Sequence, residues 1–262
     1  MAASAPASTK PRLPSLKGTN LPAVHLRGPA LGSVNGIPVK KSGNWSGYVA
    51  LPKSGSSTTF TYVYAQYTVP SVNCSKTPSE DAFAYHWVGL DGWNSGTVEQ
   101  DGVADFCVGN TPSYEAWWET YPGGLNEVFA VNPGDAIKSS VTYVSGTKKY
   151  TLKLTDETTG QSFNVSESCG STTCDNSSAE VITEGYTSSP WVGTADFGQE
   201  FYNSVEATGS GTSGSLTDSA WTTIESVAYG ATSNKPMTQP GQIYQGESLS
   251  RSAFQVSWER VD

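Results

Sequence analysis

Short runs in which apolar and polar residues alternate fill most of the chain, and this period-two pattern predicts β-strands. The clearest run, TTFTYVYAQYTV at residues 58–69, is rich in aromatic and β-branched residues and ends before a proline. Turn signals such as Pro122-Gly123-Gly124 separate the runs. We expect further strands at residues 83–90, 114–121, 136–144, 149–154, 161–165, 180–186, 194–197, 201–205, 220–227 and 252–258.

The number and spacing of these runs predict an all-β fold. No long stretch has the 3.6-residue period of an amphipathic helix, and many short strands at this spacing are typical of an antiparallel sandwich or barrel. The chain has 262 residues, which is enough to bury a sizeable core. We therefore expect one β domain at residues 44–262.

Residues 1–43 differ from the rest of the chain. They are rich in Pro, Ala, Ser and Lys and show no sustained period of either 3.6 or 2. The texture changes at residue 44, where the strand-like sequence NWSGYVA begins. We interpret residues 1–43, called the leader below, as a pro-segment or linker.

Charge is distributed unevenly between these two parts. The net charge is −9, yet residues 1–41 carry six basic residues and no acidic one, so the rest of the chain has a net charge of −15. An acidic surface can simply keep a protein soluble. A body with so few cations also suits low pH, because protonated carboxylates stop repelling one another. The same acidity argues against a nucleic acid partner.

All four cysteines lie in the acidic part, and an even number in a Gly- and Ser-rich β chain predicts two disulfides and a secreted protein. Cys169 and Cys174 are close enough to close a small loop, and Cys74 with Cys107 would follow by elimination, although three pairings are possible. No C-x-x-C pair occurs and the chain has only two histidines, so we expect no metal site and no cofactor.

The sequence contains no apolar run long enough to span a membrane. The first residues, MAASAPASTKPRLP, lack the hydrophobic segment of a signal peptide, so export would require a signal that this sequence does not include. Four glycosylation sequons would matter only in a eukaryotic source, and they begin at Asn44, Asn73, Asn164 and Asn176.

The common hydrolase chemistries lack their residues here. A serine or cysteine nucleophile usually needs a histidine base, but His25 lies in the leader and His86 precedes Trp87 in an aromatic strand, where a structural role is the more ordinary one. The chain contains no G-x-S-x-G, H-E-x-x-H, D-T-G or D-S-G motif. If this protein is an enzyme, its chemistry rests on carboxylates, amides and aromatic side chains.

Three segments carry candidate residues. The sequence YHWVGLDGWNSGTVEQDG, at residues 85–102, also fits an ordinary β-hairpin. In YEAWWETYP, at residues 114–122, Glu115, Trp117 and Glu119 share one face of a strand, which suits either a cleft wall or a solvent face with one exposed aromatic. In AEVITEGY, at residues 179–186, Glu180 and Glu184 share a face.

Together these segments resemble a known family. The ordered set W-V-G-φ-D-G, φ-x-Q-x-G, Y-x-A-W-x-E-x-Y-P and A-E-x-x-x-E makes residues 44–262 similar to the glutamic peptidases, also called eqolisins. The segments NWSGYVA and 61–70 also resemble the first strands of that family. The resemblance implies a concanavalin-like or lectin-like sandwich of two long antiparallel sheets, in which the concave sheet forms the substrate cleft.

The resemblance also implies site residues. It identifies Gln100 and Glu184 as the catalytic pair, and one residue is inserted between Gln100 and Asp105 relative to the family pattern. Substrate-binding positions of the family fall here on Trp87, Asp91, Tyr114, Trp117 and Glu119.

The chemistry expected of this pair is the hydrolysis of peptide bonds in acid. Glu184 as carboxylate takes a proton from a water molecule, while the amide of Gln100 holds that water and then stabilises the oxyanion. A pair without histidine stays active at a pH at which histidine is protonated. The basic leader would dock on an acidic cleft at neutral pH, leave in acid and be cut near residues 40–43. A disordered spacer is the alternative.

Two other functions fit parts of the sequence. A glycoside hydrolase could use Glu119 and Glu184 as paired acids, and a carbohydrate-binding module could stack sugars on Trp93, Trp117 and Trp118. Gln100 discriminates between them and the peptidase, because sugar hydrolysis does not need an amide there. We expect a monomer that acts on polypeptides, with its own leader as a further partner and without a membrane anchor.

Overall fold

The computed structural model describes residues 25–76, 81–108, 110–169, 173–185, 193–230, 234–245 and 251–260. The described part of the chain contains one short helical element, the 3-10 turn η1 (Cys74–Lys76), and no helix long and apolar enough to cross a membrane. Its strands are β1 (Arg27–Val34), β2 (Ile37–Ser42), β3 (Trp45–Leu51), β4 (Phe60–Thr68), β5 (Ala82–Asp91), β6 (Val98–Val108), β7 (Thr111–Tyr121), β8 (Asn126–Ala130), β9 (Ala136–Val144), β10 (Lys149–Asp156), β11 (Ser162–Glu167), β12 (Ala179–Gly185), β13 (Gly193–Thr194), β14 (Gln199–Gly209), β15 (Thr212–Gly214), β16 (Thr222–Tyr229), β17 (Pro236–Pro240), β18 (Tyr244–Gln245) and β19 (Ser252–Trp258).

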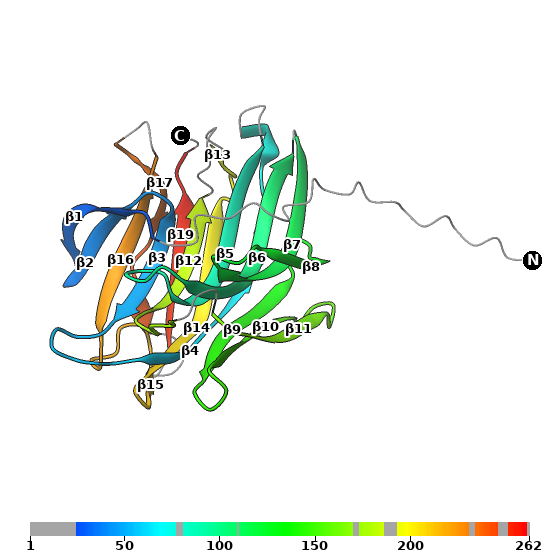
Figure 1. Ribbon diagram of the computed structural model, residues 1–262. Coiled ribbons are helices and arrows are strands. Elements are labelled where there is room, and N and C mark those ends of the chain that lie inside the picture. The colour runs from blue at the N-terminus through cyan, green and yellow to red at the C-terminus, as the bar shows by residue number, and fades with distance from the viewer. Residues whose placement is uncertain are drawn as a thin grey trace, which may run out of the picture.

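These strands confirm the prediction of an all-β fold, and each predicted run overlaps one of them. In the described part of the chain, hydrogen bonds connect nineteen strands into one sheet, and only the β2–β16 and β5–β13 pairs among them are parallel. A continuous path runs β8-β7-β6-β5-β12-β3-β16-β17-β19-β14-β4-β9-β10-β11. The sheet turns back on itself into a nearly closed, barrel-like shape (Figure 1), and the rings of Phe129 and Phe163 at its two ends are 6.3 Å apart.

Alternation of side chains gives strands β12, β5, β6 and β7 two different faces. One face, which includes Val88 and Val181, packs into the main hydrophobic core and approaches β4 and β9. The opposite face carries a second apolar cluster that includes Trp87 and Trp117. Strand parity also places the predicted site residues Gln100, Glu119 and Glu184 on this second face.

A glycine on β6 allows two tryptophans to lie over the middle of this second face. Gly102 pairs with Trp87 on β5 and with Trp117 on β7. A Cβ atom at Gly102 would lie 2.8 Å from the Cα and Cβ atoms of Trp87, and closer still to the carbonyl oxygen of His86. No larger residue fits there, so this glycine fixes the spacing of the strands that carry the candidate site.

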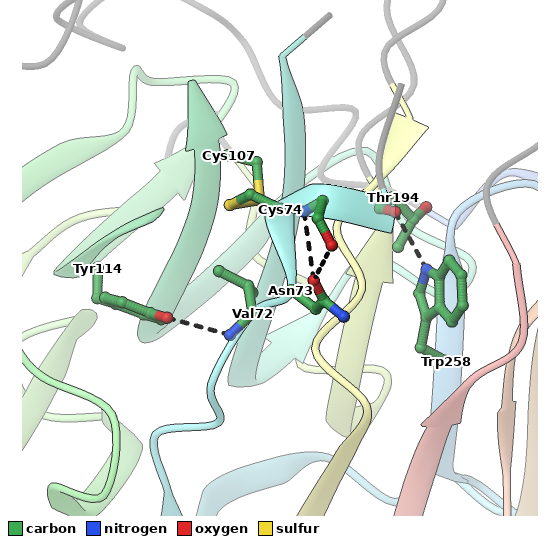
Figure 2. The surroundings of a disulfide bond; sticks show 8 residues. Val72, Asn73, Cys74, Cys107, Tyr114, Thr194 and Trp258 are labelled. Atoms are coloured by element: carbon green, nitrogen blue, oxygen red, sulfur yellow. Dashed lines mark hydrogen bonds between the residues drawn. A yellow bond between two sulfur atoms is a disulfide. The ribbon is translucent and has the colours of Figure 1, made fainter. Parts of the chain in front are cut away.

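The two disulfides follow the pairing suggested by sequence separation. Cys169 pairs with Cys174, and Cys74 pairs with Cys107. The second bond ties the loop after β4 to the end of β6 (Figure 2). Next to it, the backbone N–H of Val72 donates a hydrogen bond of 3.0 Å to the hydroxyl of Tyr114. This corner therefore holds the ends of β4, β6 and β7 together.

The described part of the leader is a β-hairpin, which the sequence reasoning did not predict. Strands β1 and β2 turn at Asn35 and Gly36, which have φ angles of 50° and 81°, and an Asn-Gly pair is the sequence most favoured for such a turn. Strand β2 then pairs with β16. Residues 1–24 lie outside the described residues. The division at residue 43 stays a prediction, but β2 is hydrogen-bonded into the sheet.

The close packing at Gly102 leads to a stability prediction. We expect Gly102→Ala to lower the free energy of unfolding by about 3 kcal/mol or more, because the added methyl group overlaps backbone on β5. Gly96→Ala is the matched control, since Gly96 is exposed and a Cβ there meets no atom within 4 Å. Urea unfolding measures both. Equal stability of the two variants would contradict the packing argument.

Candidate active site

The second face brings together residues from four neighbouring strands. In the register of these strands, Glu180 on β12 lies in line with Gly89 on β5, Gln100 on β6 and Glu119 on β7. Gly89 has no side chain between its neighbours, and a Cβ there would lie 2.8 Å from the Trp87 ring. The polar residues can therefore approach one another across the strand that separates them.

Glu184 is held at the end of β12 by two N–H donors. The side-chain nitrogen of Asn44 donates to Oε1 at 2.8 Å, and the indole nitrogen of Trp87 donates to Oε2 at 3.1 Å. Two further hydrogen bonds orient the Asn44 side chain. Its Oδ1 accepts one from the backbone N–H of Leu26 and one from the hydroxyl of Ser42. Both oxygens of Glu184 thus face donors, an arrangement that suits a carboxylate.

Gln100 is oriented by Glu119. Its side-chain Nε2 donates a hydrogen bond of 2.9 Å to Oε2 of Glu119. The Oε1 atoms of both residues are buried and have no hydrogen-bond partner. The Gln100 amide therefore keeps a free oxygen acceptor and one further N–H, which are the two functions expected of a residue that positions a water and then an oxyanion.

The carboxyl groups of this site have raised pKa values. Burial raises the pKa of Glu184 well above its usual value, the charge of Glu119 raises it further, and the Asn44 and Trp87 donors act in the opposite direction. Burial also raises the pKa of Glu119 to about 8, against the effect of its hydrogen bond with Gln100. The two carboxyl groups are therefore close enough to interact, and low pH keeps at least one of them neutral.

The predicted substrate-binding residues lie in three places. Trp87, Trp117 and Glu119 lie on the same face as Gln100 and Glu184. Asp91 ends β5 and accepts hydrogen bonds of 2.7 Å from the backbone N–H groups of Asn176 and Ser177, so it fixes a loop.

Tyr114 is not brought together with the other predicted site residues. It lies on the opposite face of β7, in the main core beside the Cys74–Cys107 disulfide (Figure 2). Alternation of side chains along β7 separates it from Trp117, and the sequence pattern already placed these two residues on different faces.

The reverse side of the same strands carries a buried polar group. His86 Nε2 lies 2.8 Å from Asp105, and His86 Nδ1 lies 3.1 Å from the hydroxyl of Thr183. Burial opposes protonation of His86, but Asp105 and Glu200 outweigh it, so the pKa of His86 is raised. The histidine joins β5, β6 and β12 and does not contact the candidate site, as its aromatic sequence context indicated.

Asn44 is the residue that the sequence reasoning missed. The motif NWSG was interpreted as a sign of the first strand and as a glycosylation sequon, yet its asparagine contacts Glu184 directly. Asn44 is fully buried, so its sequon is inaccessible in the folded chain. A signal was available, because an asparagine at the start of a strand that is otherwise apolar is rarely there for packing alone.

The arrangement contains the types of group that water activation needs. It provides a carboxyl group between two N–H donors and an oriented amide on the same face. No group of three or more His, Cys, Asp or Glu side chains that could hold a metal ion occurs among the described residues. Trp93 and Trp117 are buried and Trp118 lies on the opposite face, so these residues do not form the exposed platform of a carbohydrate-binding module.

This chain is similar to known proteins of one peptidase family. The model of the Peptidase A4 family matches residues 43–241. Aspergillopepsin-2 of Aspergillus niger is 31% identical over 209 residues, which cover 70% of this chain and 71% of that protein. A crystal structure of scytalido-glutamic peptidase with a transition state analog inhibitor superposes with a TM-score of 0.66 at 24% identity, over 83% of this chain and 98% of that chain.

A second solved structure, aspergilloglutamic peptidase from Aspergillus niger, has a TM-score of 0.55 and 27% identity, over 68% of this chain and 99% of that chain. These matches do not favour the glycoside hydrolase or carbohydrate-binding alternatives. The chain belongs to the Peptidase A4 family, and it is a glutamic endopeptidase.

Proposed function

We propose that this acid-active endopeptidase hydrolyses peptide bonds through Glu184 and Gln100. One observation carries the assignment: a carboxyl group held only by N–H donors shares a sheet face with an amide that Glu119 orients. Glu184 as carboxylate removes a proton from water and later passes it to the leaving nitrogen. The free Oε1 of Gln100 holds that water, and its remaining N–H stabilises the oxyanion.

The same proposal covers the setting of the enzyme. We infer that the second face forms a concave cleft, with the two halves of the folded-back sheet acting as the layers of a sandwich. Trp87 and Trp117 are fully buried in the closed site, and we propose that they line the cleft for an extended polypeptide once it opens. The two disulfides support secretion into an oxidising compartment. We further propose a monomer whose leader inhibits it before processing.

The assignment of the pair predicts a loss of proteolysis without a loss of fold. We expect Glu184→Gln to lower kcat/KM by about 10³-fold or more, because it removes the base. We expect Gln100→Glu to lower it by about 10²-fold or more, because a carboxylate repels the oxyanion. Digestion of an acid-denatured protein with pepstatin present, which suppresses contaminating aspartic peptidases, measures both.

The controls for this experiment are Glu259→Gln and Gln199→Glu, which make the same chemical changes at exposed positions. They should keep the activity of the unchanged enzyme. Near-full activity of either site variant, with a native circular dichroism spectrum, would refute the assignment.

Trp87 tests the proposed state of Glu184. Because its indole N–H favours the carboxylate, Trp87→Phe should raise the pKa of Glu184 and move the acidic limb of the kcat/KM profile upward by about one pH unit. Trp118→Phe, on the opposite face of β7, is the control. An unchanged acidic limb in Trp87→Phe would show that this limb does not report Glu184.

The buried carboxyl groups predict a protein that is most stable in acid. Burial raises the pKa of Glu99 to about 9 and that of Glu200 to about 8, from an ordinary value of 4.5. A raised folded-state pKa contributes stability below the unfolded value, and this contribution is lost as pH rises through the folded value. The Tm should therefore fall between pH 4.5 and about 9.

Glu99→Gln isolates one contribution to this slope. The variant should show a weaker fall of Tm with rising pH, by about 5 °C or more over this range, whatever its absolute stability. The exposed Glu259→Gln variant should keep the original slope. A Tm that rises from acid to neutral pH in the unchanged protein would contradict the prediction.

A further inference from the structure

The described end of the leader lies against the candidate site. The ring of His25 stacks on Trp93 with centroids 3.7 Å apart and planes within 10°, and it lies 5.7 Å from the ring of Trp45. Trp45 packs edge-on against Trp87 at 4.9 Å, and Trp87 donates to Glu184. Aromatic contacts thus connect the leader to the proposed base.

Hydrogen bonds make a second connection. The backbone N–H of His25 donates to the carbonyl oxygen of Gly92 at 3.1 Å, and that of Leu26 donates to Oδ1 of Asn44 at 3.0 Å. The other end of the same Asn44 side chain donates to Glu184. Movement of the leader therefore changes the environment of the residue that holds the proposed base.

The site in this arrangement is closed. Gln100, Glu119 and Glu184 each have a relative exposure of 0%, and His25 has 7%. A polypeptide cannot reach a pair with no exposed surface, so some covering segment has to move before substrate binds. The segment that begins at His25 contacts Trp93 through its aromatic ring, and it contacts Gly92 and Asn44 through backbone N–H groups.

We propose that His25 and the β1–β2 hairpin form an autoinhibitory latch on the active site, and that protonation of His25 in acid releases it. The proposal rests on the assigned function of Glu184, and it adds the trigger. The latch occupies the surface formed by Trp45, Trp93 and Asn44 and keeps the enzyme latent at neutral pH.

The surroundings of His25 suit a neutral ring and do not suit a charged one. Both ring nitrogens are buried without a hydrogen-bond partner. The rings of Trp45 and Trp93 next to it carry no charge. The Gly92 carbonyl already accepts a hydrogen bond from the His25 backbone N–H. The charged group that acts on the ring is Arg27. A buried imidazolium here would lack an acceptor and would face a second positive charge.

The direction of the pH effect follows from these contacts. Burial lowers the pKa of His25 from 6.5 to about 4, and Arg27 adds to the lowering. Release restores the higher value, so the ratio of docked to released leader falls as the pH falls from 6.5 towards 4. The expected change is about tenfold for each pH unit in this range.

Release also explains how the predicted cleavage region becomes accessible. Residues 39–42 pair with β16 while the hairpin is docked, and Val39 and Ser42 are buried. A peptidase needs an extended segment without these pairings. Two cations of the hairpin contact neutral groups. Arg27 donates a hydrogen bond to the Asn94 carbonyl oxygen, and Lys41 donates one to the Asn234 side chain and lies over the Tyr229 ring. In the described part of the leader, these contacts do not depend on the acidity of the cleft.

The test uses the full chain with Gln100→Ala, which is expected to be inactive and leaves the residues under the latch unchanged. Hydrogen exchange of residues 25–42, followed by mass spectrometry and corrected for intrinsic rates, reports docking at several pH values between about 3 and 7. Protection should fall as the pH drops below 6.5. His25→Phe, which keeps an aromatic ring that cannot be protonated, should retain protection in acid.

Leu31→His in the His25→Phe protein is the matched control, because it places a histidine at an exposed position of the same hairpin and should not restore acid release. Two outcomes would overturn the proposal. One is that the His25→Phe protein loses protection at the same pH as the protein with His25 intact. The other is that the protein with His25 intact stays fully protected at about pH 3. Self-cleavage of the Gln100→Ala protein, visible as a loss of mass, would instead count against the assigned pair.

Discussion

The interaction on which the active site depends is the pair of hydrogen bonds that Asn44 and Trp87 donate to Glu184. A buried carboxyl group is costly unless its oxygens meet donors, and here each oxygen meets one. Asn44 immediately precedes β3 and Trp87 lies in the middle of β5, and these two strands flank β12. The position of Glu184 is therefore determined by the pairing of three strands, and any change in their register would separate the carboxyl group from its partners.

The sheet is built so that this register has little freedom. A Cβ atom at Gly102 would overlap the backbone of β5, and one at Gly47 would overlap the backbone of β12, so both glycines lie where strands approach closely. On the reverse side, His86 connects Asp105 on β6 with Thr183 on β12. Thr183 precedes Glu184 and His86 precedes Trp87, so the buried polar group fixes the same strands from behind.

The sequence predicted the strands and the two faces of β7, because period-two alternation is a local property of the chain. It predicted the positions of Gln100 and Glu184 only through a resemblance, since their strands meet through long-range pairing. The leader hairpin was missed although Asn35-Gly36 is a strong turn signal, because the flanking residues lack aromatic alternation. Tyr114 shows why the motif alone did not suffice. A motif gives the order of residues along a strand but not their partners, and the Tyr114 hydroxyl accepts a hydrogen bond from the Val72 backbone N–H in the core.

Burial of ionisable groups connects catalysis, stability and control through one variable. Glu99 and Glu119, on opposite faces of the site strands, have raised pKa values, so acid keeps them neutral and favours the folded chain. His25 responds to the same change in the opposite way, because its buried form is neutral and acid charges it. A fall in pH thus stabilises the sheet while it weakens the segment that covers the site. Acid can therefore release the latch without destabilising the sheet, because the latch carries an imidazole that acid charges, whereas the sheet carries carboxyl groups that acid neutralises.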